Sequence, residues 1–160
     1  MKIKAYWILL LCAVIILCGC NTQSNFGINF YYPKQADYES TQENIGHEFL
    51  NIAPDPLAYT EILNNYLAGP KTKNLTNPFP GGTHLVSISL EQETATLILS
   101  DQIAELTGID LTLACTCLSL TVKNMTGCAI VQIRAQNKLL DNQQSININT
   151  NTILLVDNVQ

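Results

Sequence analysis

The sequence has few positive charges. Lys and Arg number 8 among 160 residues against 13 Asp and Glu, a formal net charge of −5 at pH 7. Because proteins bind phosphate backbones through clustered cations, this deficit argues against nucleic-acid partners. Two of the cations, Lys2 and Lys4, precede an apolar stretch, so the remainder of the chain is more acidic still. Hydrophobic residues make up 47% of the chain, which excludes a disordered or collagen-like protein and is enough for one globular domain.

Histidine is scarce, and no familiar catalytic motif surrounds either copy. His47 lies in a polar stretch and His84 on the expected apolar side of a strand, and neither has a G-x-S-x-G nucleophile nearby. Glu91 and Glu93 form a carboxylate pair, but both belong to an expected hairpin turn, which indicates a solvated tip. We therefore expect no catalytic residues. A hydrolase whose site is assembled from distant residues is the alternative.

The sequence also lacks an apolar run long enough to span a membrane as a helix. From Ala5 to Cys20 the uncharged run is 16 residues, whereas a spanning helix needs about 20. Cations before a short apolar run that ends in small residues are typical of a secretory signal peptide. We predict a signal peptide over residues 1–19, with an uncleaved membrane anchor as the alternative.

The end of this run carries a cysteine that can accept lipid. Leu17, Cys18 and Gly19 lead to Cys20, an order that resembles the lipobox of bacterial lipoproteins. The resemblance implies cleavage between Gly19 and Cys20, a diacylglyceryl group on Cys20 and often a further acyl chain, such as palmitate, on the new amine. Two or three acyl chains anchor a protein stably, at about 0.8 kcal/mol per buried methylene. We expect a lipid-anchored protein on the extracytoplasmic side of the cell membrane.

The expected mature chain has a short tether and one domain. Residues 20–25 are small and polar, which suits a tether, and residues 26–160 form the single domain. One helix is clearly indicated within it, because Asp55 and Pro56 suit a helix start and Gly69 a helix end. Apolar residues at helical spacing support it; they are Tyr59, Ile62, Leu63, Tyr66 and Leu67.

Strands are indicated where apolar and polar residues alternate. Residues 26–32 and 45–52 are expected to be extended, residues 85–99 to form a hairpin, and residues 128–136 to form a later strand. The short apolar run Ile153–Val156 is a candidate for pairing on a sheet edge.

A second helix is indicated less directly. Ser100 and Asp101 supply a cap and an early acidic residue. Apolar residues from Ile103 to Thr121 fit helical faces, but part of this segment also alternates as a strand would. Its length of about twenty residues is too great for one strand, so we predict a helix with a break near Gly108.

Three cysteines in and after this helix invite a metal or redox interpretation. Cys115 and Cys117 form a C-x-C pair and Cys128 follows, but a structural zinc site needs a fourth ligand, and both histidines lie far away in sequence. We interpret the three as small buried hydrophobic residues. A Cys115–Cys128 disulfide is the next alternative and a metal site the last. No metal or other cofactor is expected.

Several short motifs follow one another along residues 56–140. They are Leu67, Gly69 and Pro70 after the first helix, Pro80, Gly82 and Thr83 before the hairpin, Leu99 and Ser100 before the second helix, and Thr121 late in it. Together they resemble the GerMN domain of sporulation and germination proteins and of other bacterial lipoproteins. Lys123 and Asn124, before the last strand, and residues 136–138, where the family often has a glycine, depart from its pattern.

The resemblance implies an α+β fold, in which a small mixed or antiparallel sheet carries two helices on one face, preceded by the lipoprotein signal peptide. It also implies no known enzymatic activity and membership of an envelope complex, with a link to sporulation or germination. We therefore expect a non-catalytic binding or assembly module. Its partners would be the membrane, through the lipid, and an envelope protein or a second copy. A single-pocket ligand-binding lipoprotein is a further alternative.

Overall fold

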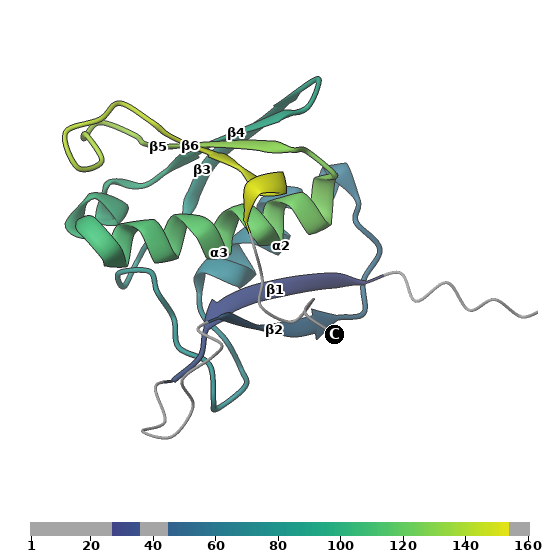
Figure 1. Cartoon of the computed structure of the whole chain (residues 1–160). Helices are drawn as coiled ribbons and strands as arrows, with labels where there is room; N and C mark the ends of the chain where they lie inside the picture. Colours follow the sequence, from purple (N-terminus) through teal and green to yellow (C-terminus); the bar gives the residue numbers. More distant parts are fainter. Residues whose placement is uncertain (1–26, 36–44, 154–160) are drawn as a thin grey trace, which may run out of the picture.

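The computed structural model describes residues 27–35 and 45–153 and arranges them in three layers (Figure 1). The predicted signal peptide, lipidation site and tether lie outside the described residues. The strands are β1 (Ile28–Pro33), β2 (Ile45–Leu50), β3 (Leu85–Glu91), β4 (Thr94–Leu99), β5 (Ile130–Ala135) and β6 (Ile146–Asn149). The helices are α2 (Tyr59–Leu67) and α3 (Gly108–Thr126), with the 3-10 turns η1 (Pro56–Ala58), η2 (Asp101–Glu105) and η3 (Thr150–Thr152). No helix among the described residues is long and apolar enough to cross a membrane.

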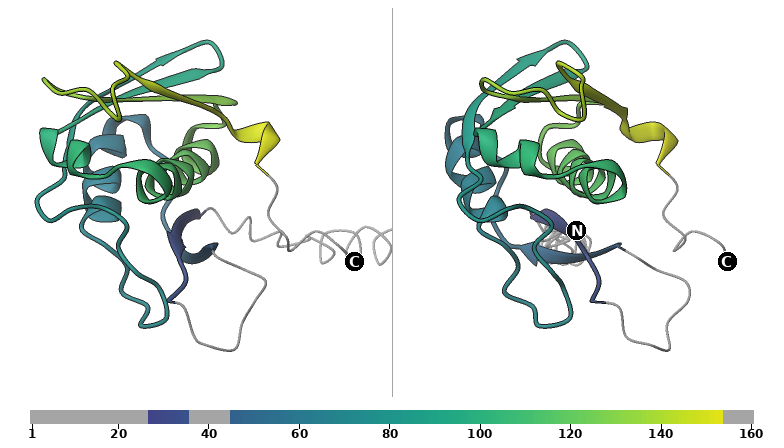
Figure 2. Two further views of the ribbon diagram at one scale, coloured as in Figure 1. Left: turned by 60° about the vertical axis from the view of Figure 1, so that its left-hand side comes forward. Right: turned by 90° about the vertical axis from the view of Figure 1, so that its left-hand side faces the viewer.

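The larger sheet is mixed and has the strand order β3-β4-β5-β6. β3 and β4 form the predicted hairpin, β5 runs parallel to β4, and β6 returns antiparallel to β5. A parallel pair needs a long crossover, which α3 supplies. Both helices lie against one face of this sheet (Figure 2). That face is apolar, and its buried side chains are Leu85, Ala95, Leu97, Leu99, Val131, Ile133 and Ala135. The predicted α+β fold is confirmed.

Helix α2 lies where the sequence predicts it. The carboxylate of Asp55 accepts a hydrogen bond from Leu57 N at 2.9 Å, although the first turn is 3-10 and α2 begins at Tyr59. Gly69 follows the helix with φ +106°, a left-handed conformation that favours glycine. All the residues of the predicted apolar stripe are buried, namely Tyr59, Ile62, Leu63, Tyr66 and Leu67.

Helix α3 is buried on most sides because it lies between the larger sheet and β1 (Figure 2). Its buried residues are Leu111, Ala114, Cys115, Cys117, Leu118, Ser119, Leu120, Thr121, Val122 and Met125. A helix buried on two sides has no single apolar stripe, which is why its sequence also fits strand alternation. The predicted break is confirmed: η2 ends at Glu105 and α3 begins at Gly108. Ser100 is the N-cap residue of η2 and Asp101 lies in its first turn, as predicted, but the Ser100 side chain makes no capping hydrogen bond.

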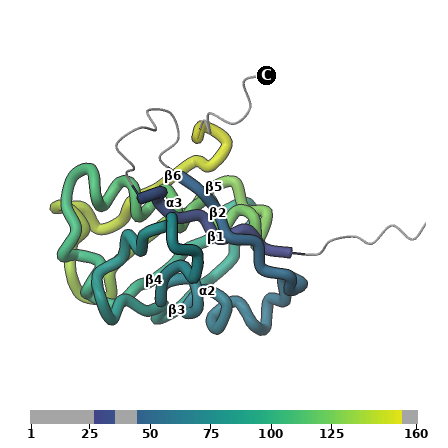
Figure 3. The backbone as a smooth tube through the Cα atoms, turned by 90° about the horizontal axis from the view of Figure 1, so that it is seen from below, coloured from purple at the N-terminus to yellow at the C-terminus, as the bar shows by residue number. Residues whose placement is uncertain are grey.

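Strands β1 and β2 form a separate antiparallel pair on the far side of α3 from the larger sheet. Seen from below, the pair crosses the middle of the molecule (Figure 3). Ile28, Phe30 and Tyr32 of β1 are buried, whereas His47 and Phe49 of β2 are exposed. Both strands are predicted by the sequence, but their separation from the main sheet is not.

One expectation about the larger sheet is wrong. His84 is exposed rather than on the apolar side, because Leu85 faces the core and the chain then bulges between Leu85 and Ser87. A bulge inserts one residue and shifts the alternation, so Ile88 turns inward. The outer strand next to β5 is β6; Ile153 follows η3 and the rest of the Ile153–Val156 run lies outside the described residues, so its pairing on an edge stays a prediction.

Candidate functional site

The motif after the first helix forms a tight junction at the carboxyl end of α2. The Asn77 side-chain amide donates to the Leu67 carbonyl at 3.2 Å, and a Cβ at Gly69 would lie only 3.0 Å from the same amide nitrogen. One turn earlier, Asn64 Oδ1 accepts from Leu85 N at 2.8 Å. Glycine is therefore needed at position 69 for both its backbone angle and the space beside it.

The next two motifs join the loop to the hairpin and to η2. Both the main-chain N–H and the hydroxyl of Thr83 donate to the Pro80 carbonyl, at 3.1 and 2.8 Å. Ser100 Oγ accepts from His84 N at 3.0 Å, and Ser100 N donates to the His84 carbonyl at 2.9 Å. Thr83 and Ser100 are buried, so these hydrogen bonds satisfy groups that water does not reach.

Four of the motif residues line a hollow of about 380 Å³ between the end of α2 and the Pro80–His84 turn, namely Leu67, Pro80, Gly82 and Thr83. His84 lies at its rim, where its ring nitrogen Nδ1 is 3.0 Å from the Gly82 carbonyl. No acidic side chain lines the hollow. These four residues are brought together, but the Thr83 hydroxyl, the polar side-chain group among them, bonds to main chain.

The family model named Germane, described as sporulation and spore germination, matches residues 29–141. The chain belongs to the Germane family. The match includes all the motif residues from Leu67 to Thr121 and extends to β1 and β2, which lie outside the resemblance found in the sequence.

Two solved structures share the Germane fold. A candidate lipoprotein from Clostridium perfringens superposes with a TM-score of 0.51 at 17% identity, covering 82% of this chain and 93% of that one. The tandem GerMN domains of the sporulation protein GerM from Bacillus subtilis give a TM-score of 0.52 at 16% identity, covering 76% of this chain and 43% of that one. No curated protein matches this chain.

The last motif residue of the Germane domain, Thr121, links α3 to β1. Its hydroxyl accepts from Tyr31 N at 2.9 Å, and one helical turn later Asn124 Oδ1 accepts from Asn29 N at 2.7 Å. Sequence reasoning missed this role of both residues. The available signal was a pair of hydrogen-bonding side chains three positions apart, on one face of an otherwise apolar helix.

The residues considered for catalysis in this Germane domain do not converge. His47 is exposed on β2, beside the Tyr31 ring, and His84 is exposed before β3. Glu91 and Glu93 are exposed at the tip of the β3–β4 hairpin, as predicted. Within residues 27–35 and 45–153 no three His, Cys, Asp or Glu side chains are grouped so that they could hold a metal ion.

The three cysteines of α3 and the following turn are buried free thiols. Burial raises the pKa of Cys115 and of Cys117 to about 12, because desolvation disfavours the thiolate. Their burial agrees with the interpretation as small hydrophobic residues. Cys115 and Cys128 are not joined in this structure, and a disulfide between them stays a prediction.

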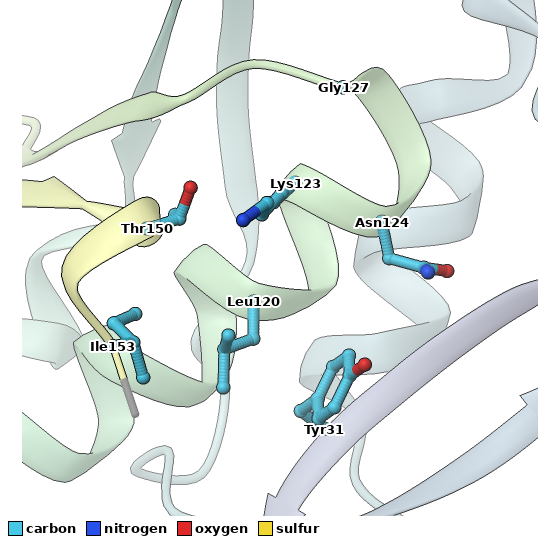
Figure 4. A pocket seen from close by; sticks show the side chains of 7 residues that line it. All are labelled: Tyr31, Leu120, Lys123, Asn124, Gly127, Thr150 and Ile153. Atoms are coloured by element: carbon cyan, nitrogen blue, oxygen red, sulfur yellow. The ribbon is translucent and has the colours of Figure 1, made fainter. Parts of the chain in front are cut away.

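A second hollow, of about 450 Å³, lies between β1, the end of α3 and η3 (Figure 4). Lys123 and Asn124, the two residues that depart from the family pattern, both line it. Their polar ends are already engaged, since Lys123 Nζ donates to Asn151 Oδ1 at 3.0 Å and Asn124 accepts from β1. The two residues that depart from the family pattern therefore make contacts within the domain.

A third hollow, of about 600 Å³, lies between β2 and the end of α2. Glu48 lines it, and its carboxylate accepts from the main-chain N–H groups of Lys71 and Thr72, the first at 2.8 Å. Phe49, from the same strand, is 55% exposed. This end of the molecule thus combines an anchored strand with an exposed aromatic ring.

The outer face of the larger sheet is polar and uncovered. Gln132 on β5 bonds to both neighbouring strands, through its Oε1 to the Thr96 hydroxyl at 3.5 Å and through its Nε2 to Asn147 Oδ1 at 3.0 Å. Arg134 is exposed on the same face. Such a face suits contact with another polar surface rather than burial in a core.

Proposed function

We propose that this protein is a lipid-anchored envelope lipoprotein whose Germane domain is a non-catalytic binding or assembly module in sporulation or germination. One contrast carries the proposal. The motif residues Thr83, Ser100 and Thr121 hold main chain inside the domain and Gly69 fits a tight junction, whereas the exposed surface includes strand edges and a polar sheet face. Motif residues that stabilise the fold, together with exposed strand edges, suit a module that binds other proteins.

Membership of the Germane family supports the link to sporulation. The structural neighbours support the proposal as well, since one is a candidate lipoprotein and the other a sporulation protein with two such domains in tandem. Tandem domains indicate that the fold works beside copies of itself.

Anchoring at Cys20 would hold the domain close to the membrane. Cys20 precedes the first residue of β1 by eight positions, so the chain between them reaches at most about 28 Å. The lipid would also confine copies to two dimensions, which raises their effective concentration and lets weak contacts form. Binding that is negligible in dilute solution would therefore matter at the membrane.

The anchor is tested by Cys20→Ala in the full chain. We expect the substitution to abolish incorporation of a labelled fatty acid and to leave the precursor uncleaved or released, because no thiol accepts the lipid. Cys18→Ala is the matched control and should be labelled and processed normally. A parent chain that takes up no labelled fatty acid and stays at precursor size in membranes would instead indicate an uncleaved helical anchor.

The binding role is tested by cross-linking in the native envelope. A lysine-reactive cross-linker should yield a discrete product that contains this chain together with an envelope protein or a second copy. The product should be lost from Cys20→Ala cells if confinement by lipid drives binding. A chain that gives no product in envelopes, and stays monomeric when tethered densely to vesicles, contradicts the proposal and favours a single-pocket ligand binder.

A further inference from the structure

The outer edge of β1 is closed by side chains from three other segments. Tyr31 N donates to Thr121 Oγ1 and Tyr31 O accepts from the Tyr66 hydroxyl at 2.8 Å. Further along the same edge, Asn29 N donates to Asn124, and the Pro33 carbonyl accepts from Thr76 N at 2.9 Å. These hydrogen bonds leave no room for another strand beside β1.

The outer edge of β2, by contrast, has no partner strand among residues 27–35 and 45–153. Tyr31 pairs with His47, and both main-chain groups of Tyr31 point away from β2. In an antiparallel pair such facing residues both direct their N–H and C=O groups outward, so those of His47, and by alternation those of Ile45 and Phe49, point away from β1. No described residue bonds the main-chain groups of His47 or Phe49 on that side. Figure 1 shows β2 on the far side of β1 from α3.

This edge also lacks the features that usually prevent strand pairing. The residues of β2 whose main-chain groups point outward are Ile45, His47 and Phe49, with no lysine, proline or bulge among them. The edges of the larger sheet are better protected: β3 contains a bulge between Leu85 and Ser87, and β6 has only four residues. Among the described strands, β2 is therefore the most available for another strand.

We infer that a second copy of this chain pairs with β2, antiparallel and about a two-fold axis through His47, an inference that rests on the proposed assembly function. The spacing of the strand is self-complementary about this residue. Ile45 and Phe49 flank His47 at equal distances, so the axis places each Ile45 opposite the Phe49 of the other copy. Pairs of an aromatic and a β-branched side chain are favourable across antiparallel strands, and the three residue pairs exchange about six main-chain hydrogen bonds.

No like charges face each other when two copies of β2 pair in this register. The same axis places Glu48 opposite the Gly46 of the other copy. Each Glu48 thus faces a residue without charge, and its carboxylate stays bound to the main-chain N–H groups of Lys71 and Thr72 in its own chain.

The contact between the two β2 strands is small, so we expect it to form at the membrane rather than in dilute solution. A strand pair of this length buries less than the roughly 1,200 Å² of a stable soluble complex. Pairing should therefore be weak in solution and visible when lipid confines the copies. The product would be a continuous four-stranded ribbon, β1-β2-β2-β1, with one domain on each side.

His47→Cys in the full chain, in its native membrane, tests the two-fold axis. Facing residues in a hydrogen-bonded antiparallel pair have Cα atoms about 5.5 Å apart, within the range of a disulfide. We expect a covalent dimer on mild oxidation, in about tenfold greater yield than for Ser89→Cys, an equally exposed position on the edge strand β3. Equal yields from the two variants overturn the inference.

A charge exchange tests the register independently. Ile45→Glu and Phe49→Lys should each abolish the dimer captured at position 47, because each buries a charge against an apolar side chain. Together in one chain they should restore it, since the introduced carboxylate of each copy then faces the introduced ammonium of the other, twice across the axis. A double variant as defective as the single ones overturns the register.

The outcomes separate this inference from the proposed function. If the lysine-reactive cross-linker captures a partner while His47→Cys gives no dimer, the assembly function stands and pairing through β2 is wrong. If neither reagent captures anything from membranes that contain the lipidated chain, both fail.

Discussion

Tyr66 connects α2 to β1 at the level of single atoms. Its hydroxyl donates to the Tyr31 carbonyl at 2.8 Å, and its own carbonyl accepts from the Tyr32 hydroxyl at 2.7 Å. Its ring stacks on Tyr32, with centroids 4.8 Å apart, and meets Phe30 and Phe79 edge-on. Aromatic pairs in these geometries are favourable beyond their buried area, so one side chain fixes both the packing and the edge of β1.

Removing the Tyr66 hydroxyl should therefore be costly. Tyr66→Phe is expected to lower the free energy of unfolding by about 1–3 kcal/mol, because it leaves the Tyr31 carbonyl without its partner in a buried region. Urea denaturation measures the change. Tyr31→Phe, which alters a half-buried ring, is the control and should stay within about 0.5 kcal/mol of the parent. Equal effects of the two substitutions would contradict the assigned role.

At the scale of elements, α3 determines where β1 lies. Thr121 and Asn124 present oxygens from one face of the helix, and the N–H groups of Tyr31 and Asn29 donate to them. The helix thus completes the edge of a strand from the other layer. Within the part of the chain that the structure describes, this contact leaves β2 as the unpaired edge of the smaller sheet.

Thr121→Val tests this contact. The substitution keeps the shape of the side chain but removes the acceptor, so we expect a loss of about 1–3 kcal/mol in the free energy of unfolding. Thr121→Ser retains the hydroxyl and should cost clearly less. Urea denaturation of the two variants gives the comparison, and equal losses would show that the hydrogen bond contributes nothing.

The start of α2 is tested by Asp55→Ala. Loss of the cap should cost about 0.5–2 kcal/mol, and the lower half of that range is expected because the hydrogen bond to Leu57 N is exposed. Thermal unfolding measures it, with Thr60→Ala on the exposed face of α2 as the control. An unchanged midpoint for Asp55→Ala would remove the assigned helix start.

At the scale of the whole molecule, the core holds several acidic groups in their neutral form. Cys115 and Cys117 lie on α3 between the two sheets, and burial raises the pKa of each to about 12. Burial likewise raises the pKa of the Tyr66 phenol and of the Tyr32 phenol. At high pH these groups ionise readily in the unfolded chain, whereas the apolar surroundings of the folded domain oppose their ionisation.

The domain should therefore unfold in alkali. A group whose pKa is higher in the folded state stabilises the fold below its unfolded pKa, and that contribution is lost as pH rises. We expect constant stability up to about pH 8.5, where unfolded cysteine begins to ionise, and a fall toward pH 12. Urea midpoints across this range measure it. Cys115→Ala with Cys117→Ala should delay the onset, and a parent protein equally stable at pH 8 and pH 11 would contradict the expectation.

The sequence by itself determined the elements whose patterns are local. The stripe of α2, the cap at Asp55, the stop at Gly69 and the hairpin over residues 85–99 are all correctly predicted. Each depends on residues a few positions apart. When one face of a helix or strand is buried, its apolar residues recur at the period of that element, so the sequence shows which face it is. The family resemblance follows from the same local motifs, and the lipid anchor stays a prediction from the N-terminal residues.

Tertiary structure alone decided the features that depend on distant segments. Burial of α3 on two sides removes its single stripe, and the bulge after Leu85 turns His84 outward. β6 contains only two apolar residues, Ile146 and Ile148, so its pairing with β5 left little trace in the sequence. The closed edge of β1 and the open edge of β2 arise because α3 reaches a strand some ninety residues earlier in the chain, a contact that no local spacing can encode.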